Sequence, residues 1–503
     1  MPSDVAARLR ETAERAPATV ALIWQEQETT YGELDARVDR AAAALQDLGV
    51  GPGDRVALLL GNVPAFVEAY FGVLRAGAAA VPLTLGLAPD EVGHALSDSG
   101  AGVLVVASVV ADDMVDLATE LDVIVLVAGA TDVPSGGTRW RDALEQAGPL
   151  RPIERQPDDL GALVYTSGTT GRPRGAMLTR GNLQANQDQS LAGRFKVSGD
   201  DVVLLVLPLS HIYALNVGLG ACTRVGATIV LMERFDPTTS LDVIAEHRVS
   251  IVLGAPPMYV AWVNTPGIET RDLSSLRLAV SGAAPLPVSV LDRFRDVTGI
   301  TIEEGYGLTE ASPSVASNSM APVARPGSVG FALPDIELRL VDENGRDVAL
   351  GDPGELLVRG PNVFQGYWND EAATAEALDG DGWLHTGDVG TRDEDGYLYL
   401  VDRLKDLILV SGFNVYPREV ERVLDQHEAV DECAVVGVPH PYTGEAVKAY
   451  VVPRHGFELT EDELAVFCRD RLARYKCPEV VEFVDALPHT SSGKIRRSVL
   501  RAG

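Results

Sequence analysis

The chain has 503 residues, 46% of them hydrophobic, and a formal charge of −30. This length exceeds one ordinary hydrophobic core and predicts two or more domains. The negative field would repel a phosphate backbone, so we expect no nucleic-acid partner, and any anionic ligand needs cations or N–H groups placed locally.

Apolar residues and cysteines both indicate a soluble, reduced environment. No uninterrupted apolar stretch reaches about 18 residues, and the N-terminal MPSDVAARLRETAERAP lacks the apolar core of a signal peptide. The four cysteines, Cys222, Cys433, Cys468 and Cys477, show no C-x-x-C spacing. We therefore expect a cytoplasmic protein with no transmembrane segment, whose thiols are reduced and mostly buried.

The first 130 residues alternate between helical and strand patterns. Thr30 and Glu33 form a capping-box pattern, and the apolar residues that follow at helical spacing predict a helix over 30–49. The next predicted elements are strands at 56–60, 79–81, 103–106 and 123–127 and helices at 64–75 and 89–97. Successive βαβ units of this kind predict a parallel sheet covered by helices.

The most informative loop lies within residues 161–186, GALVYTSGTTGRPRGAMLTRGNLQAN. An apolar strand at 163–165 leads into Thr166-Ser167-Gly168-Thr169-Thr170-Gly171, where glycines let N–H groups turn inward and four hydroxyls add donors. Arg172 and Arg174 add positive charge. We interpret it as a phosphate-binding loop; the alternative is a polar hairpin loop. A Walker loop is disfavoured, because Pro173 stands where glycine is required and no lysine follows.

Later residues extend the sheet and then change its character. Strands at 202–207, 227–231, 251–253 and 276–280 and a helix at 241–247 continue the βαβ pattern. The last strand opens on SGAAPLP, whose small residues allow a flat ligand to approach closely, and a second ligand loop follows at 304–310. From about residue 327, short alternating segments at 336–341, 354–358 and 397–401 predict a small antiparallel subdomain.

The last hundred residues have the pattern of a separate α+β domain. A helix is predicted at 417–426, strands at 433–438 and 448–452, and a capped helix from 460 to about 472. This length suffices for an independent domain. We therefore predict an α/β N-terminal domain over 1–401, with helix-covered, mostly parallel sheets, and a C-terminal domain over 402–503.

The sequence YTSGTTGRPRG closely resembles the signature loop of the adenylate-forming superfamily, which comprises acyl-CoA synthetases, peptide-synthetase adenylation domains and firefly luciferases. The resemblance covers nearly the whole chain. It implies ATP, Mg²⁺ and CoA as cofactor and co-substrates, and a C-terminal domain that moves. One departure is Arg174, where the family usually has lysine, so planar bidentate geometry replaces a point charge.

The resemblance also assigns nucleotide-binding roles. It implies that Tyr306 stacks on adenine, Thr309 contacts the α-phosphate and Glu310 binds Mg²⁺, whereas Asp388 accepts both ribose hydroxyls and Arg403 joins it. The implied ATP-binding residues are Thr166, Ser167, Gly168, Thr169, Thr170, Gly171, Arg174, Gly282, Ala283, Ala284, Glu304, Gly305, Tyr306, Gly307, Thr309, Asp388, Arg403 and Lys494, with Thr166 and Glu310 on the metal. The alternatives are a core aromatic at Tyr306, a helix-start charge at Glu310, a turn aspartate at Asp388 and a surface arginine at Arg403.

Three later positions are implied to serve the reaction. Lys494 in SSGKIRR resembles the catalytic lysine, Ser411, Gly412 and Phe413 lie in the thioester-forming loop, and Lys405 corresponds to the hinge. The segment VSGFNVYP resembles the corresponding loop of medium- and long-chain fatty-acyl-CoA ligases. Luciferase-type enzymes usually carry lysine at the place of Ser411. The alternatives are solvated cations at Lys494 and Lys405, the latter in a rigid linker.

The segment from 202 to 232 indicates the substrate class. It contains no acidic residue, so an α-amino acid would lack a partner for its ammonium in a desolvated pocket. His211 and Tyr213 are predicted pocket walls, with His211 also a catalytic candidate beside Thr309, Arg403 and Lys494. Gly218 is expected to leave space for the substrate tail, while ordinary core packing is the alternative for Tyr213.

These inferences predict ATP- and Mg²⁺-dependent ligation of a medium- or long-chain fatty acid to CoA through an acyl-AMP intermediate. Catalysis would depend on positioning and electrostatics, without a nucleophilic side chain. The alternatives are an aromatic-acid CoA ligase, an acyl-AMP ligase that loads an acyl carrier protein, and a non-catalytic nucleotide-binding sensor.

Overall fold

The computed structural model describes residues 5–130, 132–166, 173–194, 196–284, 286–411, 413–454, 456–457, 459–489 and 495–502. The chain forms two compact units. The first comprises Met1–Glu337 and Val358–Leu384, and the second Leu338–Leu357 and His385–Gly503. The predicted boundary near residue 402 lies inside the second unit and stays a prediction about which residues move together.

A seven-stranded sheet carries the phosphate-loop region of the first unit. Its order is β7 (Gly137–Arg139), β6 (Ile124–Ala128), β5 (Val103–Ala107), β3 (Arg55–Leu59), β4 (Ala79–Leu83), β8 (Leu160–Thr166) and β9 (Arg174–Thr179). The neighbours are parallel except at the β8–β9 pair. The prediction of a mostly parallel sheet is confirmed here.

The first unit contains a second sheet, of nine strands. Its order is β16 (Phe331–Ala332), β15 (Ser314–Ser317), β14 (Ile302–Gly307), β13 (Leu278–Ser281), β12 (Ile251–Gly254), β10 (Val202–Leu205), β11 (Thr228–Leu231), β1 (Val20–Trp24) and β2 (Gln27–Thr30). Strands from β14 to β1 are parallel, and the strands at both edges are antiparallel. The carboxyl ends of parallel strands meet at one edge, where ligand loops of such sheets lie.

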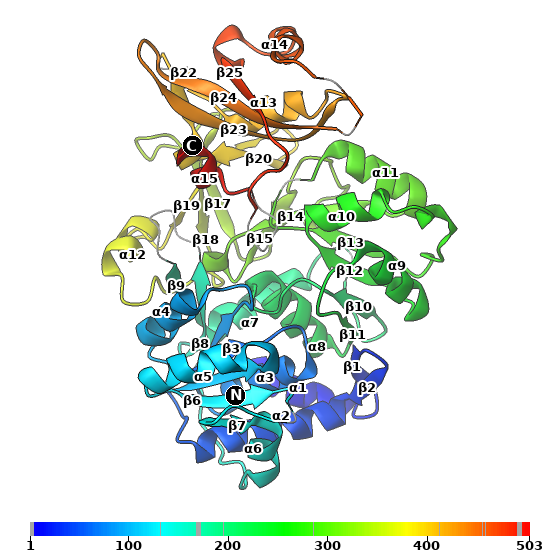
Figure 1. The fold of residues 1–503 in the computed structure, drawn as a ribbon, viewed down its shortest axis with the longest axis vertical. Coiled ribbons are helices and arrows are strands. Elements are labelled where there is room, and N and C mark those ends of the chain that lie inside the picture. The colour runs from blue at the N-terminus through cyan, green and yellow to red at the C-terminus, as the bar shows by residue number, and fades with distance from the viewer. Residues whose placement is uncertain are drawn as a thin grey trace. The chain divides into compact units, whose positions relative to one another are not determined.

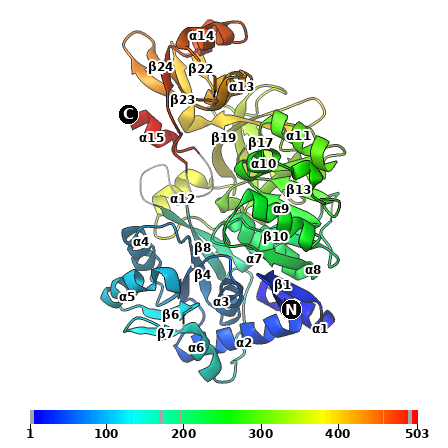
Figure 2. The same cartoon turned by 45° about the vertical axis from the view of Figure 1, so that its right-hand side comes forward.

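Helices cover these sheets because their apolar faces complete the two cores. The helices are α1 (Val5–Arg15), α2 (Tyr31–Asp47), α3 (Pro64–Arg75), α4 (Pro89–Ser99), α5 (Ala111–Glu120), α6 (Trp140–Gln146), α7 (Arg180–Ser190), α8 (Cys222–Val225), α9 (Pro237–Glu246), α10 (Pro256–Val263), α11 (Val288–Thr298) and α12 (Glu371–Ala377). Residues of α4 and α5 join one core with β3 to β6, and residues of α9, α10 and α11 join another with the central strands of the nine-stranded sheet (Figures 1 and 2).

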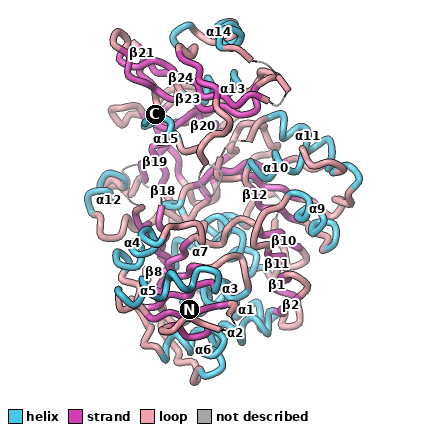
Figure 3. The backbone as a smooth tube through the Cα atoms, in the orientation of Figure 1, coloured by secondary structure: helices cyan, strands magenta, loops and turns pink. Residues whose placement is uncertain are grey.

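The second unit contains two smaller sheets. The four-stranded sheet has the order β17 (Glu337–Val341), β18 (Gly354–Arg359), β19 (Leu384–Arg392) and β20 (Leu398–Arg403), and the five-stranded sheet has β22 (Phe413–Val415), β21 (Ile408–Val410), β24 (Gly444–Pro453) and β23 (Val430–His440), with β25 (Val480–Phe483) beside β24. Helices α13 (Pro417–Leu424) and α14 (Glu461–Arg469) share one core with the larger sheet, and α15 (Arg497–Ala502) packs on its other face (Figure 3). The α+β prediction for this part is confirmed.

Local sequence signals placed most elements within one or two residues. The capping box at Thr30 and Glu33 is present, and α2 begins at Tyr31. This helix ends at Asp47, two residues before the predicted end, and Leu48 beyond it is 37% exposed. Unpredicted elements include the polar helix α7, two of whose glutamines and one asparagine are buried, and a π-helix at Tyr213–Ala221.

Candidate active site

The signature loop connects the two strands of a β-hairpin. β8 and β9 are antiparallel, and Thr166 lies directly opposite Arg174. The strands on either side of the loop therefore form a β-hairpin, as the alternative interpretation states. A hairpin loop can also bind a ligand. Ser167, Gly168, Thr169, Thr170 and Gly171 lie outside the described residues, so their ATP-binding roles stay predictions.

The second ligand loop follows β14, a central parallel strand that turns into a hairpin with β15. Tyr306, near the end of β14, is 8% exposed. A Cβ at Gly307 would lie 2.3 Å from the carbonyl oxygen of Pro313, so only glycine allows the two strands to approach this closely. Thr309 and Glu310 then form a 3-10 turn with partly exposed side chains, which leaves them accessible to a ligand.

Glu304, another predicted ATP contact, accepts hydrogen bonds from the protein's own backbone. The residue is 6% exposed, and its carboxylate accepts hydrogen bonds from the backbone N–H groups of Leu286 (3.4 Å) and Gly327 (2.9 Å). It therefore joins two loops next to β14. Its predicted contact with ATP remains a prediction, and the structure adds this positioning role.

A segment that the sequence analysis did not single out lies against both ligand loops. Residues 364–370, called here the 364–370 segment, continue the sheet beside β9: the Gln365 and Trp368 N–H groups donate to Met177 and Gly175 carbonyls, and Met177 N–H donates to Gly366. Phe364 N–H donates to the carbonyl of Glu310 at 2.8 Å. This segment therefore connects the base of the signature loop to the Glu310 turn.

Side chains of this segment contact two predicted ligand residues. The Tyr367 hydroxyl donates to Glu310 Oε1 at 2.7 Å, and Asp370 pairs with Arg174 through an Nε–Oδ2 distance of 3.0 Å. The Arg174 guanidinium lies 5.7 Å from the centre of the Tyr367 ring. Burial and the Glu310 charge raise the pKa of Tyr367, so the phenol is a neutral donor. Arg174 stands where the family usually has lysine. Its planar guanidinium is a bidentate group, and Asp370 and the Tyr367 ring hold it in one orientation.

The loop after β13 has an unusual backbone next to Tyr213. Ala283 has φ of 73°, a left-handed conformation that non-glycine residues adopt at an energetic cost and that often marks functional sites. A Cβ at Gly282 would lie 3.2 Å from the Tyr213 ring, so the ring and this loop are in close contact. Ala284 is partly exposed in the same loop. The Tyr213 ring fills the space beside Gly282, and the close approach of a flat ligand to this loop stays a prediction.

The predicted acyl pocket lies at the start of the π-helix. Nδ1 of His211 accepts a hydrogen bond from Tyr213 N–H at 3.3 Å. Gly218 differs from expectation: a Cβ there would lie 2.6 Å from Leu205, so the space that glycine leaves is filled by a leucine side chain. Its glycine is thus explained by close packing of the π-helix on β10, and its contact with a substrate tail stays a prediction.

In the second unit, Asp388 and Arg403 lie opposite each other on β19 and β20. Arg403 Nε is 3.0 Å from Asp388 Oδ1, and the Asp388 side chain is 8% exposed. The preceding Gly387, inside β19, has φ of 66°, a left-handed conformation that glycine permits. The two residues that the resemblance places at the ribose are therefore joined, although their predicted contact with ATP stays a prediction.

A cluster of buried charges lies behind this pair. Asp402 is 2% exposed and accepts hydrogen bonds from the N–H groups of Arg403 and Arg418, both at 2.8 Å. Burial raises the pKa of Asp402, although these two N–H donors oppose the shift. Arg497 pairs with Glu421 at 2.6 Å, and this carboxylate raises the pKa of Arg497 against the opposing effect of burial. The cluster gives β20 a rigid charged support.

The predicted thioester loop is a short hairpin between β21 and β22. Ser411 has φ of 53°, and its N–H donates to the carbonyl of Thr443 at 2.8 Å. Phe413 is 56% exposed and stacks on Tyr475 with ring centroids 4.8 Å apart. Lys405 lies in the 3-10 turn Leu404–Asp406 directly after β20. Gly412 and Lys494 lie outside the described residues, so their roles stay predictions.

The Glu310 turn fits a magnesium ion bound mainly by a nucleotide. No group of three or more His, Cys, Asp or Glu side chains that could hold a metal exists among the described residues. Mg²⁺ is commonly held by one or two carboxylates together with substrate phosphates and water. The partly exposed carboxylate of Glu310 is a hard oxygen ligand of this kind, and the metal role of Thr166 stays a prediction.

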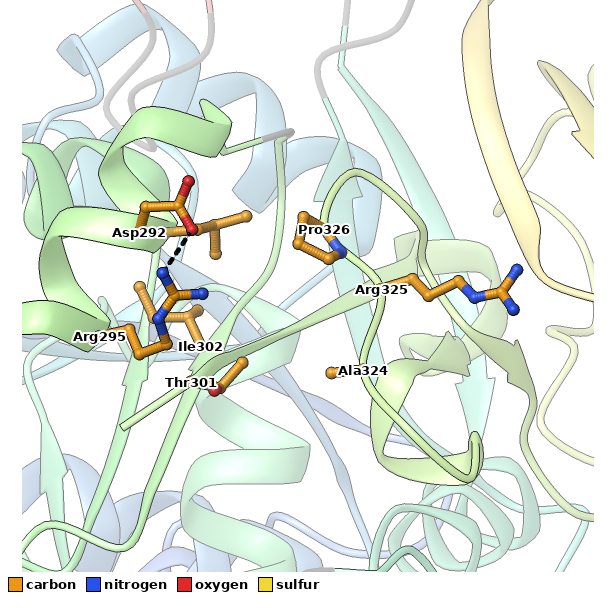
Figure 4. Close-up of a pocket in the computed structure, with 8 residues that line it drawn as sticks. Asp292, Arg295, Thr301, Ile302, Ala324, Arg325 and Pro326 are labelled. Carbon is orange, nitrogen blue, oxygen red and sulfur yellow. Dashed lines mark ion pairs between the residues drawn. The ribbon is translucent and has the colours of Figure 1, made fainter. Parts of the chain in front are cut away.

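Described residues of the first unit line a small cavity and a more open hollow. A cavity of about 20 Å³ is lined by Leu291, Asp292, Arg295, Thr301, Ile302, Ala324, Arg325 and Pro326 (Figure 4). Asp292 and Arg295, neighbours on α11, pair at its rim at 2.9 Å, and the cavity is large enough only for water. A more open hollow of about 460 Å³ lies along the 364–370 segment and α12, beside Tyr367 and Asp370. Two residues that line the more open hollow, Tyr367 and Asp370, contact the predicted ligand residues Glu310 and Arg174.

The four cysteines agree with a further expectation. All four cysteines are buried and free, as the sequence predicts for reduced thiols. In the part of the chain that the structure describes, the search for a helix with the length and hydropathy to cross a bilayer found none.

Comparisons with known proteins relate the whole chain to enzymes that activate carboxylic acids. The profile of the AMP-binding enzyme family matches residues 9–368, and that of the AMP-binding enzyme C-terminal domain matches 419–494. A feruloyl-CoA synthase of Amycolatopsis sp is 44% identical over 94% of this chain and 93% of its own, and a long-chain-fatty-acid–CoA ligase of Bacillus subtilis (strain 168) is 35% identical over 97% and 92%. The ATP-bound crystal structure of MatB from Rhodopseudomonas palustris superposes with a TM-score of 0.93 at 33% identity, covering 100% of this chain and 99% of that one.

Proposed function

Because the chain belongs to the AMP-binding enzyme family and is an adenylate-forming acid–CoA ligase that uses ATP, Mg²⁺ and CoA, we propose that its acid is an aromatic one of the hydroxycinnamate type. The expectation of a fatty acid becomes the second candidate. Both acids share the chemistry: the carboxylate attacks the α-phosphate, pyrophosphate leaves, and the CoA thiol then displaces AMP.

The observation that carries this choice is the hydroxyl of Tyr213. Its oxygen is buried and has no hydrogen-bond partner among the described residues. A buried hydroxyl without a partner costs about 1–3 kcal/mol, so a polar substituent on the substrate would recover free energy that an alkyl tail would not. The ring also lies against the Gly282 backbone, which suits a flat substrate. The higher identity to the feruloyl-CoA synthase supports the same class.

A fatty acid remains the second candidate on one specific observation. The segment 202–232 contains no acidic residue, and most of its buried side chains are apolar, with Asn216 and Thr223 as buried polar exceptions, which suits a neutral tail of either kind. The long-chain-fatty-acid–CoA ligase of Bacillus subtilis is similar over nearly the whole chain. For this candidate, affinity should rise by about 0.8 kcal/mol with each methylene until the pocket is full.

One assay separates the two candidates. Pyrophosphate release is measured with and without CoA on hydroxylated cinnamic acids, unsubstituted cinnamic acid, saturated acids of increasing length, and phenylalanine. We expect hydroxylated cinnamic acids to have the highest kcat/KM and phenylalanine to be inactive. Tyr213→Phe should reduce the preference for the hydroxylated over the unsubstituted acid about tenfold, since roughly one hydrogen bond is lost. A steady rise with alkyl chain length would overturn the aromatic assignment.

The same assay examines the acceptor. We propose that free CoA is preferred over the phosphopantetheine arm of an acyl carrier protein, which is the alternative acceptor. Release of AMP and acyl product with free CoA at a rate matching adenylation supports the first. Stalling at acyl-AMP until a carrier protein is added would instead support the second.

Residues of both units have separate roles in this proposal. Glu310 and Thr166 would hold Mg²⁺, which supplies positive charge to the phosphates, while Tyr306 would contact adenine and Asp388 the ribose. Thr309, Arg174 and Arg403 would bind phosphate or orient its neighbours, and His211 would lie at the reacting carboxylate. Lys494 would bring an ammonium to the carboxylate and α-phosphate during adenylation.

Lys494 is proposed to serve adenylation alone. Lys494→Ala should slow acyl-AMP formation by about 10²–10³-fold, because a placed donor that stabilises developing charge is lost. Given synthetic acyl-AMP and CoA, the variant should still form thioester. Equal loss in both half-reactions would contradict this division.

Lys405 is proposed as the pivot that exchanges Lys494 and the Ser411–Phe413 loop at the reacting atoms. Pivots must change their backbone dihedrals, and the fixed φ of proline prevents this. Lys405→Pro should therefore leave acyl-AMP formation intact and slow thioester formation strongly. A variant with unchanged melting temperature and wild-type thioester formation would refute the hinge.

A further inference from the structure

Tyr367 approaches Glu310 from a distant part of the sequence. Its hydroxyl is 2.7 Å from Glu310 Oε1, and 57 positions separate the two residues. Among the described residues, no hydrogen bond or ion pair reaches Glu310 Oε2. One carboxylate oxygen is therefore held by the protein, and the other remains available to a ligand.

The donor is neutral, and this matters for a cation site. Pairing with lysine or arginine would neutralise the carboxylate and weaken its attraction for a metal ion. A phenol orients the carboxylate through a hydrogen bond and leaves its negative charge in place. The only cation that the structure places at Tyr367, within its described part, is Arg174, which is paired with Asp370 and lies over the ring.

The Tyr367 ring is fixed relative to the Glu310 backbone. Phe364 N–H donates to the Glu310 carbonyl at 2.8 Å, and the Phe364 and Tyr367 rings meet edge to face at 5.0 Å. The Asn362 amide donates to the carbonyl of the next residue, Ala311, at 2.7 Å. At the other end, Tyr367 N–H donates to the Thr374 hydroxyl at 2.8 Å. The phenol therefore has one orientation, as positioning requires.

We propose that Tyr367 is a positioning residue for the metal-binding carboxylate: its hydroxyl fixes one rotamer of Glu310 so that Oε2 faces the Mg²⁺ of the bound nucleotide. The inference rests on the proposed metal role of Glu310. Through the same segment, the Arg174–Asp370 pair connects this carboxylate to the base of the signature loop, so both phosphate-binding elements share one support.

The alternative is that Tyr367 only fills space beside Glu310. Tyr367→Phe separates the two readings, because it keeps the ring and its contacts with Phe364 and Arg174 and removes only the hydroxyl. Tyr399→Phe is the matched control: the Tyr399 hydroxyl also contacts a carboxylate, Asp393 Oδ2, at 3.2 Å on β20. Thermal unfolding of both variants reports any loss of folding.

The decisive measurement is metal binding without turnover. Mn²⁺ replaces Mg²⁺ as a spectroscopic probe, and its binding to the full chain with ATP, in the absence of any acid, is titrated by electron paramagnetic resonance. Tyr367→Phe should weaken Mn²⁺ binding to the ATP complex about tenfold, as loss of a hydrogen-bond partner of a metal ligand does. The same shift should appear as a higher Mg²⁺ concentration for half-maximal adenylation, with ATP affinity in the absence of metal unchanged.

A double-mutant cycle completes the test. In a Glu310→Gln background, Tyr367→Phe should produce no further loss of Mn²⁺ affinity, because the carboxylate that it orients is gone. An unchanged Mn²⁺ affinity in Tyr367→Phe, or an equal loss in Tyr399→Phe, would overturn the inference. If Glu310→Gln itself leaves Mn²⁺ affinity unchanged, the metal role of Glu310 and the inference both fail. Failure of the aromatic-acid assignment leaves this titration unaffected, since no acid is present.

Discussion

The carboxylates of Glu310 and Asp388 are held in opposite ways. Glu310 accepts a hydrogen bond from the neutral phenol of Tyr367, whereas Asp388 contacts the guanidinium of Arg403 at 3.0 Å. Behind Glu310 lies a hydrogen-bonded backbone segment, and behind Asp388 lies a cluster of buried charges. The two units therefore support their candidate ligand residues by different physical means.

This difference matches the ligands that the two carboxylates are proposed to bind. A metal ion is attracted by charge, so a neutral donor that leaves the carboxylate fully charged is suitable. Ribose hydroxyls are neutral donors and need an acceptor in a fixed position, so an arginine that partly neutralises the carboxylate does no harm. The group that holds a ligand residue thus indicates whether the reaction uses the charge of that residue or its position.

The largest expected effect comes from replacing each of the two carboxylates with an amide of the same shape. Glu310→Gln should reduce adenylation by roughly 10³-fold, about 4 kcal/mol, because an amide attracts Mg²⁺ poorly. Asp388→Asn should reduce it by only about tenfold, since the amide oxygen still accepts a hydrogen bond. Pyrophosphate release at saturating acid measures both variants. Equal losses would break the comparison.

The second effect concerns the charge cluster behind Asp388. Arg497→Ala should destabilise the second unit by about 3 kcal/mol, because Glu421, whose side chain is 12% exposed, loses its partner in a buried site. Arg339→Ala is the control, since its partner Asp347 is 69% exposed and such surface pairs contribute less than about 1 kcal/mol. Hydrogen exchange of β23 and β24 measures the unfolding of this unit. Similar losses in the two variants would show that the cluster is not a buried support.

The smallest effect is a pH dependence that arises from Asp402. Burial raises the pKa of this carboxyl in the folded protein, so the folded state holds its proton more tightly than the unfolded state does. Stability is greatest below the ordinary aspartate pKa and falls as the pH rises through the folded pKa. Asp402→Asn should remove part of this fall. Hydrogen exchange of β23 and β24 between about pH 4 and pH 7 compares the two proteins, and identical slopes would contradict the prediction.

Much of the fold was predictable because local patterns specify local structure. The capping box at Thr30, Pro64 at the start of α3 and the βαβ succession gave helices and parallel strands close to their observed bounds. The π-helix at Tyr213–Ala221 and the polar helix α7 were missed, because neither has a clear apolar stripe. In both, tertiary packing outweighs the local pattern.

The sequence by itself predicted the ligand loops, since the order of glycines, hydroxyls and charges in one short segment limits what it can bind, and it determined the family of the chain. Only the tertiary structure brought the 364–370 segment to these loops. Tyr367 reaches Glu310, and Asp370 reaches Arg174, because backbone hydrogen bonds place that segment beside β9. The tertiary structure also filled the expected space at Gly218 with Leu205. Contacts between residues far apart in the chain depend on packing, and one sequence carries no local signal of them.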